Sequence, residues 1–337
     1  MSDAATPSKI DTPLTRDLGI EVPLICGAMY PCSNPELVAA VSEAGGIGVV
    51  QPLSMVYVHG HEFRAGMRLI RSLTDKPVGL NVIVEKSSKV YLERMQRYVD
   101  ESIEEGVRFF VTSLGNPNWV CDKAHAVGGK VYHDVVNAKW AQKALDNGVD
   151  GIIGVNDRAG GHAGDLAARK LLDDLRRFDV PLVCAGGIGD ARDFVEALDM
   201  GYDGVQMGTR FIATDECNSH PDYKQAVVDA DEDDIVLTER LTGVPVAVIR
   251  TPHLDKIGYK AGPVARWMLR GHKTKHWMRM LYSLQSFWKL KQSAKRSYSS
   301  KDFLQAGKSV HGVDAIVPAG DVVREFAAAA RGERSAA

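Results

Sequence analysis

Eight short apolar runs alternate with helical patterns between residues 23 and 207, and this alternation limits the fold more than any other feature. The runs are continuously apolar, as in strands that are covered on both faces. We expect strands at 23–29, 47–50, 78–84, 108–112, 130–135, 151–155, 181–185 and 204–207. We expect helices near 35–44, 61–73, 88–105, 118–127, 138–147, 166–178 and 190–200.

The alternation of strand and helix predicts a parallel sheet, and a count of eight strands favours a closed (β/α)8 TIM barrel. Several expected helices end in a glycine just before the next run, as in Glu105-Gly106-Val107 and Asn147-Gly148-Val149. Glycine in this position supplies the left-handed cap of a helix. An open doubly wound sheet remains the alternative, because periodicity does not show closure.

The pattern changes after residue 210. Residues 229–234 are acidic, and the only charges from 256 to 301 are basic, interleaved with aromatic residues such as Trp267 and Trp277. We predict a smaller, mostly helical second domain inserted after the eighth strand. The expected division is a barrel over 1–215, an inserted lid or substrate domain over 216–309, and a C-terminal helix over 310–337 that returns to the barrel.

The composition is that of a soluble protein, with a net charge of −2 and 45% apolar residues. The absence of a basic excess argues against nucleic acid, and the apolar runs are too short to span a membrane. Residues 1–12 lack the features of a secretory signal. Five scattered cysteines without a CxxC pair suggest reduced thiols and no metal site. We therefore expect a cytoplasmic protein.

Two glycine-bearing segments follow the seventh and eighth runs, Ala185-Gly186-Gly187 and Gly208-Thr209. TIM barrels commonly hold phosphate in the loops after these two strands. Backbone amides without bulky side chains can approach phosphate oxygens closely, and a helix starting near Asp190 would add a favourable dipole. The alternative is that the glycines only form tight turns, but their two positions favour a phosphate site.

A histidine follows the sixth run in a flexible context, because glycines occupy positions 160, 161 and 164 around His162. A neutral imidazole suits removal of a proton from a carbon acid, and its protonated form can donate to a developing anion. The alternative is a loop histidine without a function. His133, in the fifth run, fits a barrel-layer residue as well as a cofactor contact.

Asn81 is a polar amide within an otherwise apolar run, and buried amides need hydrogen-bond partners. It therefore either connects parts of the barrel or binds a heterocycle. Gly27, Ala28 and Met29 end the first run with small residues, which would let a planar ring lie against the backbone.

With these residues the sequence resembles the nitronate monooxygenase family, formerly called 2-nitropropane dioxygenases. That family also contains the FMN-dependent enoyl-acyl-carrier-protein reductase II and NAD(P)H:quinone reductases. The motifs that carry the resemblance are Gly27-Ala28-Met29, Ala44-Gly45-Gly46-Ile47-Gly48, Lys76-Pro77-Val78-Gly79-Leu80-Asn81, Ala159-Gly160-Gly161-His162-Ala163-Gly164, Ala185-Gly186-Gly187-Ile188-Gly189-Asp190, Met207-Gly208-Thr209-Arg210-Phe211 and His220-Pro221-Asp222-Tyr223-Lys224.

The resemblance implies a TIM barrel that binds FMN without a covalent bond. His162 matches the family histidine that acts as the base on a nitroalkane or as an acid in the reductases. Asp134 departs from relatives that place a lysine after the strand-five histidine. The cofactor-binding residues that the resemblance implies are Gly27, Ala28, Met29, Asn81, Gly160, Gly161, Ala185, Gly186, Gly187, Gly208 and Thr209.

The function that the resemblance implies is FMN-dependent oxidation of alkyl nitronates, small carbon acids, with O2. The alternative is an NAD(P)H-dependent reductase of enoyl thioesters or quinones, with NAD(P)H as electron donor. In either case a small-molecule substrate is expected. The basic-aromatic segment 256–301 could dock an acyl carrier protein, CoA or an anionic membrane surface, or it could be a solvated face.

Overall fold

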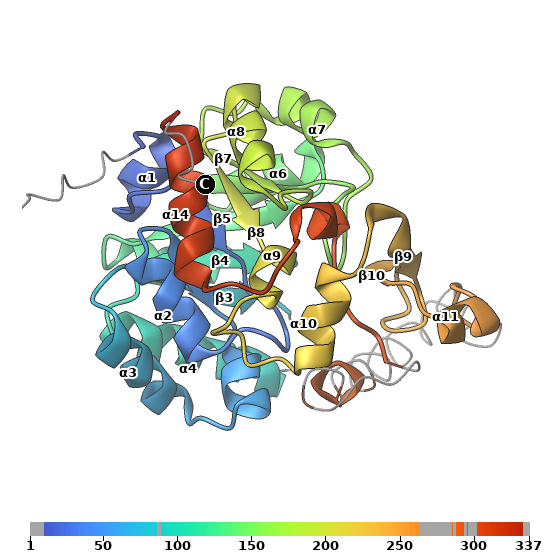
Figure 1. Ribbon diagram of the computed structural model, residues 1–337. Coiled ribbons are helices and arrows are strands. Elements are labelled where there is room, and N and C mark those ends of the chain that lie inside the picture. Colours follow the sequence, from blue (N-terminus) through green and yellow to red (C-terminus); the bar gives the residue numbers. More distant parts are fainter. Residues whose placement is uncertain are drawn as a thin grey trace, which may run out of the picture.

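Eight parallel strands form a closed barrel in the order β1 to β8 (Figure 1), so the predicted (β/α)8 fold is confirmed and the open sheet is excluded. The structure is a computed structural model, and it describes residues 10–85, 89–262, 285, 288–292, 295 and 302–332. The strands are β1 (Leu24–Cys26), β2 (Ile47–Val50), β3 (Val78–Ile83), β4 (Phe109–Ser113), β5 (Lys130–Val135), β6 (Gly151–Val155), β7 (Leu182–Ala185) and β8 (Gly204–Met207).

The expected strand β1 is shorter than its apolar run. It ends at Cys26, whereas the sequence predicted a strand to Met29. The ladder between β1 and β8 continues for one more bond, from Gly27 N to Met207 O at 2.8 Å. Beyond that point the chain leaves the sheet, and residues 27–29 form the edge of the barrel opening.

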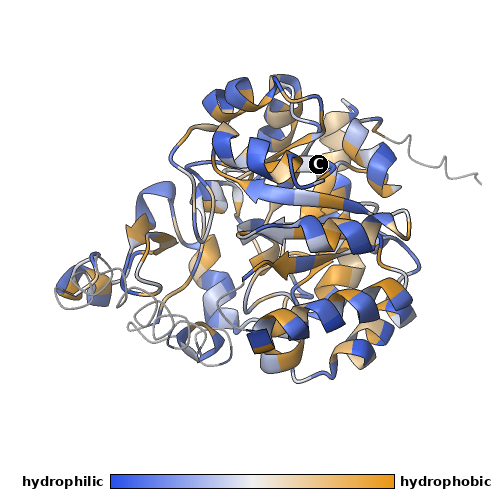
Figure 2. Cartoon of the chain, turned by 180° about the vertical axis from the view of Figure 1, so that it is seen from behind, coloured by the Kyte–Doolittle hydropathy of each residue, from blue (hydrophilic) through white to orange (hydrophobic). Residues whose placement is uncertain are grey.

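Helices surround the barrel, and Figure 2 shows hydrophilic residues mainly on their outer faces. The C-terminal helix takes the place of the eighth barrel helix, because it packs between α2 and α8. The rings of Phe194 and Phe326 meet there with centroids 5.6 Å apart. The barrel helices are α2 (Pro35–Glu43), α3 (Phe63–Leu73), α4 (Lys89–Glu104), α5 (Asn118–His125), α6 (Ala138–Leu145), α7 (Ala168–Leu175), α8 (Ala191–Met200) and α14 (Ala319–Ala330).

The N-terminal end of the barrel is closed by a short helix that the sequence did not predict, α1 (Pro13–Leu18). Leu14 of α1 is fully buried, and a Cβ added at Gly204 would lie 2.3 Å from its Cδ2 atom. The hydroxyl of Tyr132 donates a hydrogen bond of 3.0 Å to Asp17 of the same helix. These contacts fill the interior of the barrel at this end.

The described part of 216–309 contains helices and also a two-stranded antiparallel sheet, which the sequence did not predict. The segment lies beside the barrel opening in Figure 1. Most of the basic-aromatic segment 256–301, including Trp267 and Trp277, lies outside the described residues, so the mostly helical insertion and its boundaries stay predictions. Helix α9 (Thr209–Ile212) precedes this segment, and the α-helices and strands described within it are α10 (Pro221–Val228), β9 (Ile235–Thr238), β10 (Val246–Ile249) and α11 (Pro252–Ile257).

Among the described helices, none combines the length and the apolar character that a membrane crossing requires.

Candidate functional site

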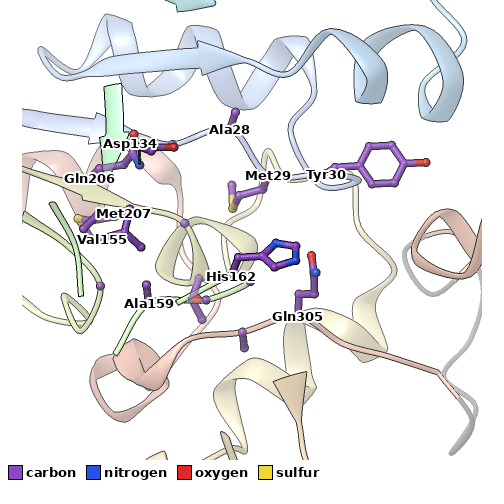
Figure 3. Close-up of a pocket in the computed structure, with 18 of the residues that line it drawn as sticks. Ala28, Met29, Tyr30, Asp134, Val155, Ala159, His162, Gln206, Met207 and Gln305 are labelled. Carbon is purple, nitrogen blue, oxygen red and sulfur yellow. Dashed lines mark hydrogen bonds between the residues drawn. The ribbon is translucent and has the colours of Figure 1, made fainter. Parts of the chain in front are cut away.

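A cavity of about 620 Å³ opens at the C-terminal ends of the barrel strands. Its volume lies in the range of roughly 300–1,000 Å³ that is usual for small-molecule and cofactor sites. Figure 3 shows Ala28, Met29 and His162 at this cavity. All twelve residues that the sequence selected line it: Gly27, Ala28, Met29, Asn81, Gly160, Gly161, His162, Ala185, Gly186, Gly187, Gly208 and Thr209.

The floor of the cavity is a polar layer of the barrel interior. Alternate residues of each strand point inward, and the inward positions nearest the C-terminal ends include Gln51, Asn81, Asp134 and Gln206, all of which line the cavity. The layer beneath it is apolar and contains Ile153. The barrel thus changes from a sealed apolar core to a polar floor within one strand length.

Asp134 and Gln206 form a pair in this floor (Figure 3). The side-chain amide of Gln206 donates to Asp134 Oδ1 at 3.5 Å. Its other polar atom, Oε1, is buried and has no partner among the described residues. Loss of water on burial raises the pKa of Asp134 to about 7, and the hydrogen bond from Gln206 opposes this rise. The carboxyl is therefore partly protonated near neutral pH.

The loop after β7 makes a concave turn of bare backbone. Gly186 has a φ of +117° and Gly187 a φ of +80°, which favour glycine. A Cβ at Gly186 would lie 2.3 Å from Asn156 Oδ1, so no side chain fits. Asn156 also fixes this turn, since its Nδ2 donates to Gly186 O at 2.9 Å. Among the described residues, the N–H groups of Gly187 and Gly208 have no protein acceptor.

In the next helix, α8, acidic side chains accept hydrogen bonds from backbone N–H groups at its N-terminus. Asp190 Oδ1 accepts from Asp193 N at 2.8 Å, and Asp193 Oδ2 accepts from Gly189 N at 2.8 Å. These carboxylates occupy the positive end of the helix. The free amides that suit an anion are therefore those of the glycine turn before the helix, and the expected contribution of the α8 dipole is already used by its own acids.

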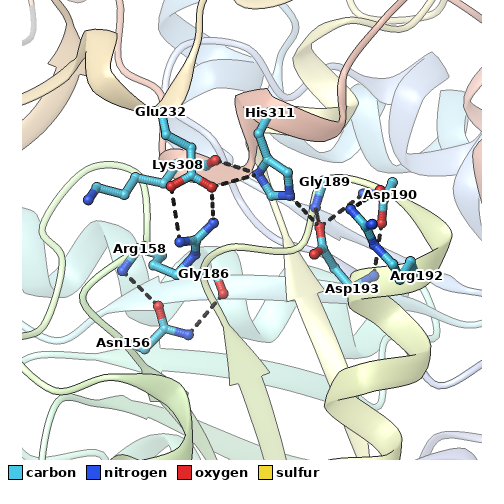
Figure 4. Close-up of polar contacts among 10 residues, drawn as sticks. All are labelled: Asn156, Arg158, Gly186, Gly189, Asp190, Arg192, Asp193, Glu232, Lys308 and His311. Atoms are coloured by element: carbon cyan, nitrogen blue, oxygen red, sulfur yellow. Dashed lines mark hydrogen bonds and ion pairs between the residues drawn. The ribbon is translucent and has the colours of Figure 1, made fainter.

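A network of charged side chains braces the outside of this loop (Figure 4). Arg158, from the loop after β6, pairs with Glu232. His311 lies 3.0 Å from Asp193 and 3.3 Å from Glu232. A Cβ at Gly187 would lie 2.6 Å from Arg158 Nε, so the guanidinium group packs directly against the turn. The network ties the turn to residues on both sides of the insertion.

The loop after β8 approaches the chain at residue 307. Thr209 Oγ1 accepts a hydrogen bond of 2.9 Å from Gly307 N. A Cβ at Gly160 would lie 3.0 Å from the same nitrogen, and a Cβ at Gly307 would lie 2.5 Å from Gly160 N. Three segments that are distant in sequence therefore meet at one edge of the cavity, and only glycine allows the contact.

His162 projects into the cavity from the loop after β6. Gly161 turns the backbone with a φ of +67°, and its carbonyl accepts from Ala247 N of β10 at 2.7 Å. His162 Nε2 lies 3.4 Å from the hydroxyl oxygen of Thr242. The ring is open to the cavity but walled by protein, and this loss of bulk water lowers its pKa. The imidazole is therefore neutral at neutral pH.

His133 does not line the cavity. It lies on the outward face of β5, buried against the surrounding elements, and its Nδ1 is 2.8 Å from the hydroxyl of Thr112. Burial lowers the pKa of His133 to about 4. Of the two interpretations that the sequence allowed, a cofactor contact is excluded, and a position in the inner barrel layer is also wrong.

Sequence reasoning missed several residues that line the cavity. Gln206 and Gln51 lie in its floor, and Tyr30, Leu114 and Gln305 lie around it. The signal for Gln206 was present, because it is a polar amide within the otherwise apolar run 204–207 and so needs a hydrogen-bond partner. The other positions depend on loops, whose course the sequence does not determine.

The fold and the site define an enzyme of the (β/α)8 type, with its catalytic cavity at the C-terminal ends of the strands. The family model for nitronate monooxygenase matches residues 11–328. The chain therefore belongs to the nitronate monooxygenase family and is an oxidoreductase.

Similar proteins and solved structures agree with this family. A Rhodococcus jostii protein named (3aS,4S,5R,7aS)-5-hydroxy-7a-methyl-1-oxo-octahydro-1H-indene-4-carboxyl-CoA dehydrogenase is 31% identical over 251 residues, covering 74% of this chain and 69% of that protein. A probable nitronate monooxygenase of Staphylococcus saprophyticus is 28% identical, covering 74% of this chain and 81% of that protein. The structure of FabK from Thermotoga maritima superposes with a TM-score of 0.78 at 28% identity, covering 96% of this chain and 97% of that chain.

Proposed function

We propose that the protein is an FMN-dependent oxidoreductase in which His162 moves a proton at the reacting carbon of the substrate. The observation that carries the proposal is the juxtaposition of a bare-amide turn, a polar floor and an imidazole around one cavity. FMN would supply the redox chemistry, and the protein would orient the substrate and handle protons.

The residues present fit FMN. The unpaired N–H groups of Gly187 and Gly208 suit the phosphate, because nothing bulky shields them. The buried, unpaired Oε1 of Gln206 suits an N–H of the ring, and Asn81 offers a further amide in the same floor. The backbone at Gly27, Ala28 and Met29 would lie along the isoalloxazine.

His162 is suited to act as a base. The protein walls around its ring keep the imidazole neutral at neutral pH, and the neutral form accepts a proton. Thr242, at 3.4 Å from Nε2, restricts the ring orientation. His162 would take the α-proton of a nitroalkane, or return a proton to the corresponding carbon in the reductive direction.

The first candidate reaction is the oxidation of alkyl nitronates with O2. Membership of the nitronate monooxygenase family supports it, as does the Staphylococcus saprophyticus relative. The cavity would suit a small carbon acid or its nitronate beside a flavin, since its lining is mostly apolar around the single imidazole.

The second candidate is oxidation or reduction of a thioester of CoA or an acyl carrier protein, with NAD(P)H as donor in the reductive direction. The 31% identical relative named for a carboxyl-CoA dehydrogenase favours this substrate class. Leu114, with 62% of its surface exposed, lines the cavity, as do Ile83 and Val136, and these side chains offer apolar surface to an acyl group. Docking of the carrier through segment 256–301 stays a prediction, because most of that segment lies outside the described residues.

Anaerobic bleaching of the bound flavin separates the candidates. The purified protein, loaded with FMN, would be mixed in turn with NADH, NADPH, ethylnitronate and a saturated acyl-CoA, and the flavin absorption would be followed. Bleaching by the nitronate alone supports the first candidate. Bleaching by a nicotinamide or the acyl-CoA supports the second. A protein that remains colourless and does not bind added FMN would disprove the proposed function.

A further inference from the structure

Asp134 differs from every other residue that lines the cavity in the described structure, because it is the one carboxyl among them. The same lining contains no lysine and no arginine. A carboxylate in the floor would therefore be a buried negative charge without a cation to balance it, which is costly. The surroundings of Asp134 therefore favour its neutral, protonated form.

The groups that face Asp134 from neighbouring elements do not balance its charge. Ile153 is its partner on β6, and Gln206 contacts it across the barrel from β8. On β4, Ser113 follows Thr112, the partner of His133, and lines the same cavity. The titratable groups elsewhere around the cavity are Tyr30, Cys32, His162 and Tyr223.

Asp134 and Gln206 together present a donor and an acceptor. A protonated carboxyl carries one O–H donor, and the unpaired Oε1 of Gln206 is an acceptor. The pyrimidine edge of a flavin has the complementary pattern, a ring N–H between two carbonyl oxygens. Gln206 can accept from the N–H while Asp134 donates to an adjacent carbonyl.

We propose that Asp134 tunes the redox potential of the flavin: as a neutral acid it donates a hydrogen bond to the pyrimidine edge, and as a carboxylate it opposes reduction. This inference rests on the proposed FMN site and goes beyond it. Reduction adds two electrons and at least one proton to the ring, so negative charge increases at that edge. A carboxylate there repels this charge, and Asp134 consequently takes up an additional proton when the flavin is reduced.

The test is the flavin midpoint potential, measured by equilibration with a reference dye over roughly two pH units on either side of neutrality. The proteins are the FMN-loaded wild type, Asp134→Asn and Asp157→Asn. Asparagine keeps the shape and a donor but cannot ionise. Asp157 is exposed on the loop after β6 and does not line the cavity, so its variant removes the same charge from outside the site.

The wild type and Asp157→Asn are expected to show a steeper fall of potential with pH through neutrality, corresponding to one extra proton per two electrons. Asp134→Asn should lack this extra slope. At about two pH units above neutrality and a fixed ambient potential, the ratio of reduced to oxidised flavin should be at least about tenfold higher in Asp134→Asn than in the wild type.

Equal slopes in the wild type and Asp134→Asn would overturn the inference. If Asp134→Asn does not bind FMN, Asp134→Ser is measured in its place with the same expectation. If neither variant holds the cofactor, the wild type decides, because a potential without extra slope around neutrality would equally overturn it. A wild type that does not bind FMN would instead disprove the proposed function.

Discussion

The two ends of the barrel interior are built from the same eight strands but have opposite chemistry. At the N-terminal end, Leu14 of α1 and the rings of Phe109 and Tyr132 fill the interior. At the C-terminal end, Asn81, Asp134 and Gln206 face a cavity of about 620 Å³. One end is closed and apolar, and the other is open and polar.

Residues that stabilise the barrel and residues that line the cavity lie on the same strands, at opposite ends. Tyr132 and Asp134 are two residues apart on β5, so both point inward. Tyr132 is fully buried, and its ring meets that of Phe109 edge to face with centroids 5.4 Å apart. Asp134 instead lines the cavity. Substitutions at the closed end should therefore change the free energy of unfolding, and those at the open end should change cofactor binding or turnover.

The largest effect is expected at the glycine turn. Gly187→Leu should yield protein without FMN and hence without turnover, because its Cβ would lie 2.6 Å from Arg158 Nε and the side chain would disturb the proposed phosphate site. The measurement is the flavin absorption of the purified variant after incubation with FMN. Gly128→Ala is the control for backbone strain, since Gly128 has a φ of +71° with no atom within 4 Å of an added Cβ. A fully yellow Gly187→Leu protein would contradict the phosphate assignment.

A substitution at the closed end is expected to lower the stability of the protein without loss of the cofactor. Phe109→Ala should lower the free energy of unfolding by about 3–5 kcal/mol, because it leaves a cavity in the apolar layer. Urea unfolding measures the change. The matched control is Leu114→Ala, just beyond the other end of β4, where the side chain is exposed and stability should hardly change. Equal losses in the two variants would abolish the distinction between the ends.

A substitution of His162 tests the role of the open end. His162→Ala should keep bound FMN and the stability of the wild type but lose turnover by roughly a hundredfold or more, as expected for removal of an acid or base. Steady-state kinetics gives the value, with the neutral nitroalkane if a nitronate bleaches the flavin, because the nitronate has already lost the α-proton, and with the thioester if that bleaches it. In the wild type, kcat/KM should persist below the ordinary imidazole pKa of 6.5, because the pKa of His162 is lowered. Unchanged turnover in the variant would remove His162 from the mechanism.

The smallest effect is expected at His133, outside both ends of the interior. Its pKa is about 4 in the folded protein and 6.5 in the unfolded chain. Below pH 6.5 the unfolded chain binds a proton that the folded protein does not, so stability falls by up to about 1.4 kcal/mol per pH unit until pH reaches about 4. His133→Asn should flatten this dependence in urea unfolding at about pH 5 and 7. The same decline in both proteins would refute the role of His133.

The strands were predictable because burial on both faces leaves an apolar run of strand length. Helix α1 was missed because it spans only six residues. Strands β9 and β10 were missed because each is stabilised by pairing with the other and not by a pattern in its own sequence. The glycines and His162 were predictable because loops at strand ends converge in a barrel. The environment of Asp134 was not, since it depends on the register of strands that are distant in sequence.

The contact between Gly161 and Ala247 gives the imidazole two anchors, one from the barrel and one from the inserted strand pair. The glycine turn after β7, where we propose that the phosphate binds, is fixed by Asn156 rather than by β10. Exchange of the strand pair between relatives would thus move His162 relative to the proposed cofactor site and leave the turn in place. Members of the family could therefore acquire new substrates through changes in the β9–β10 strand pair alone.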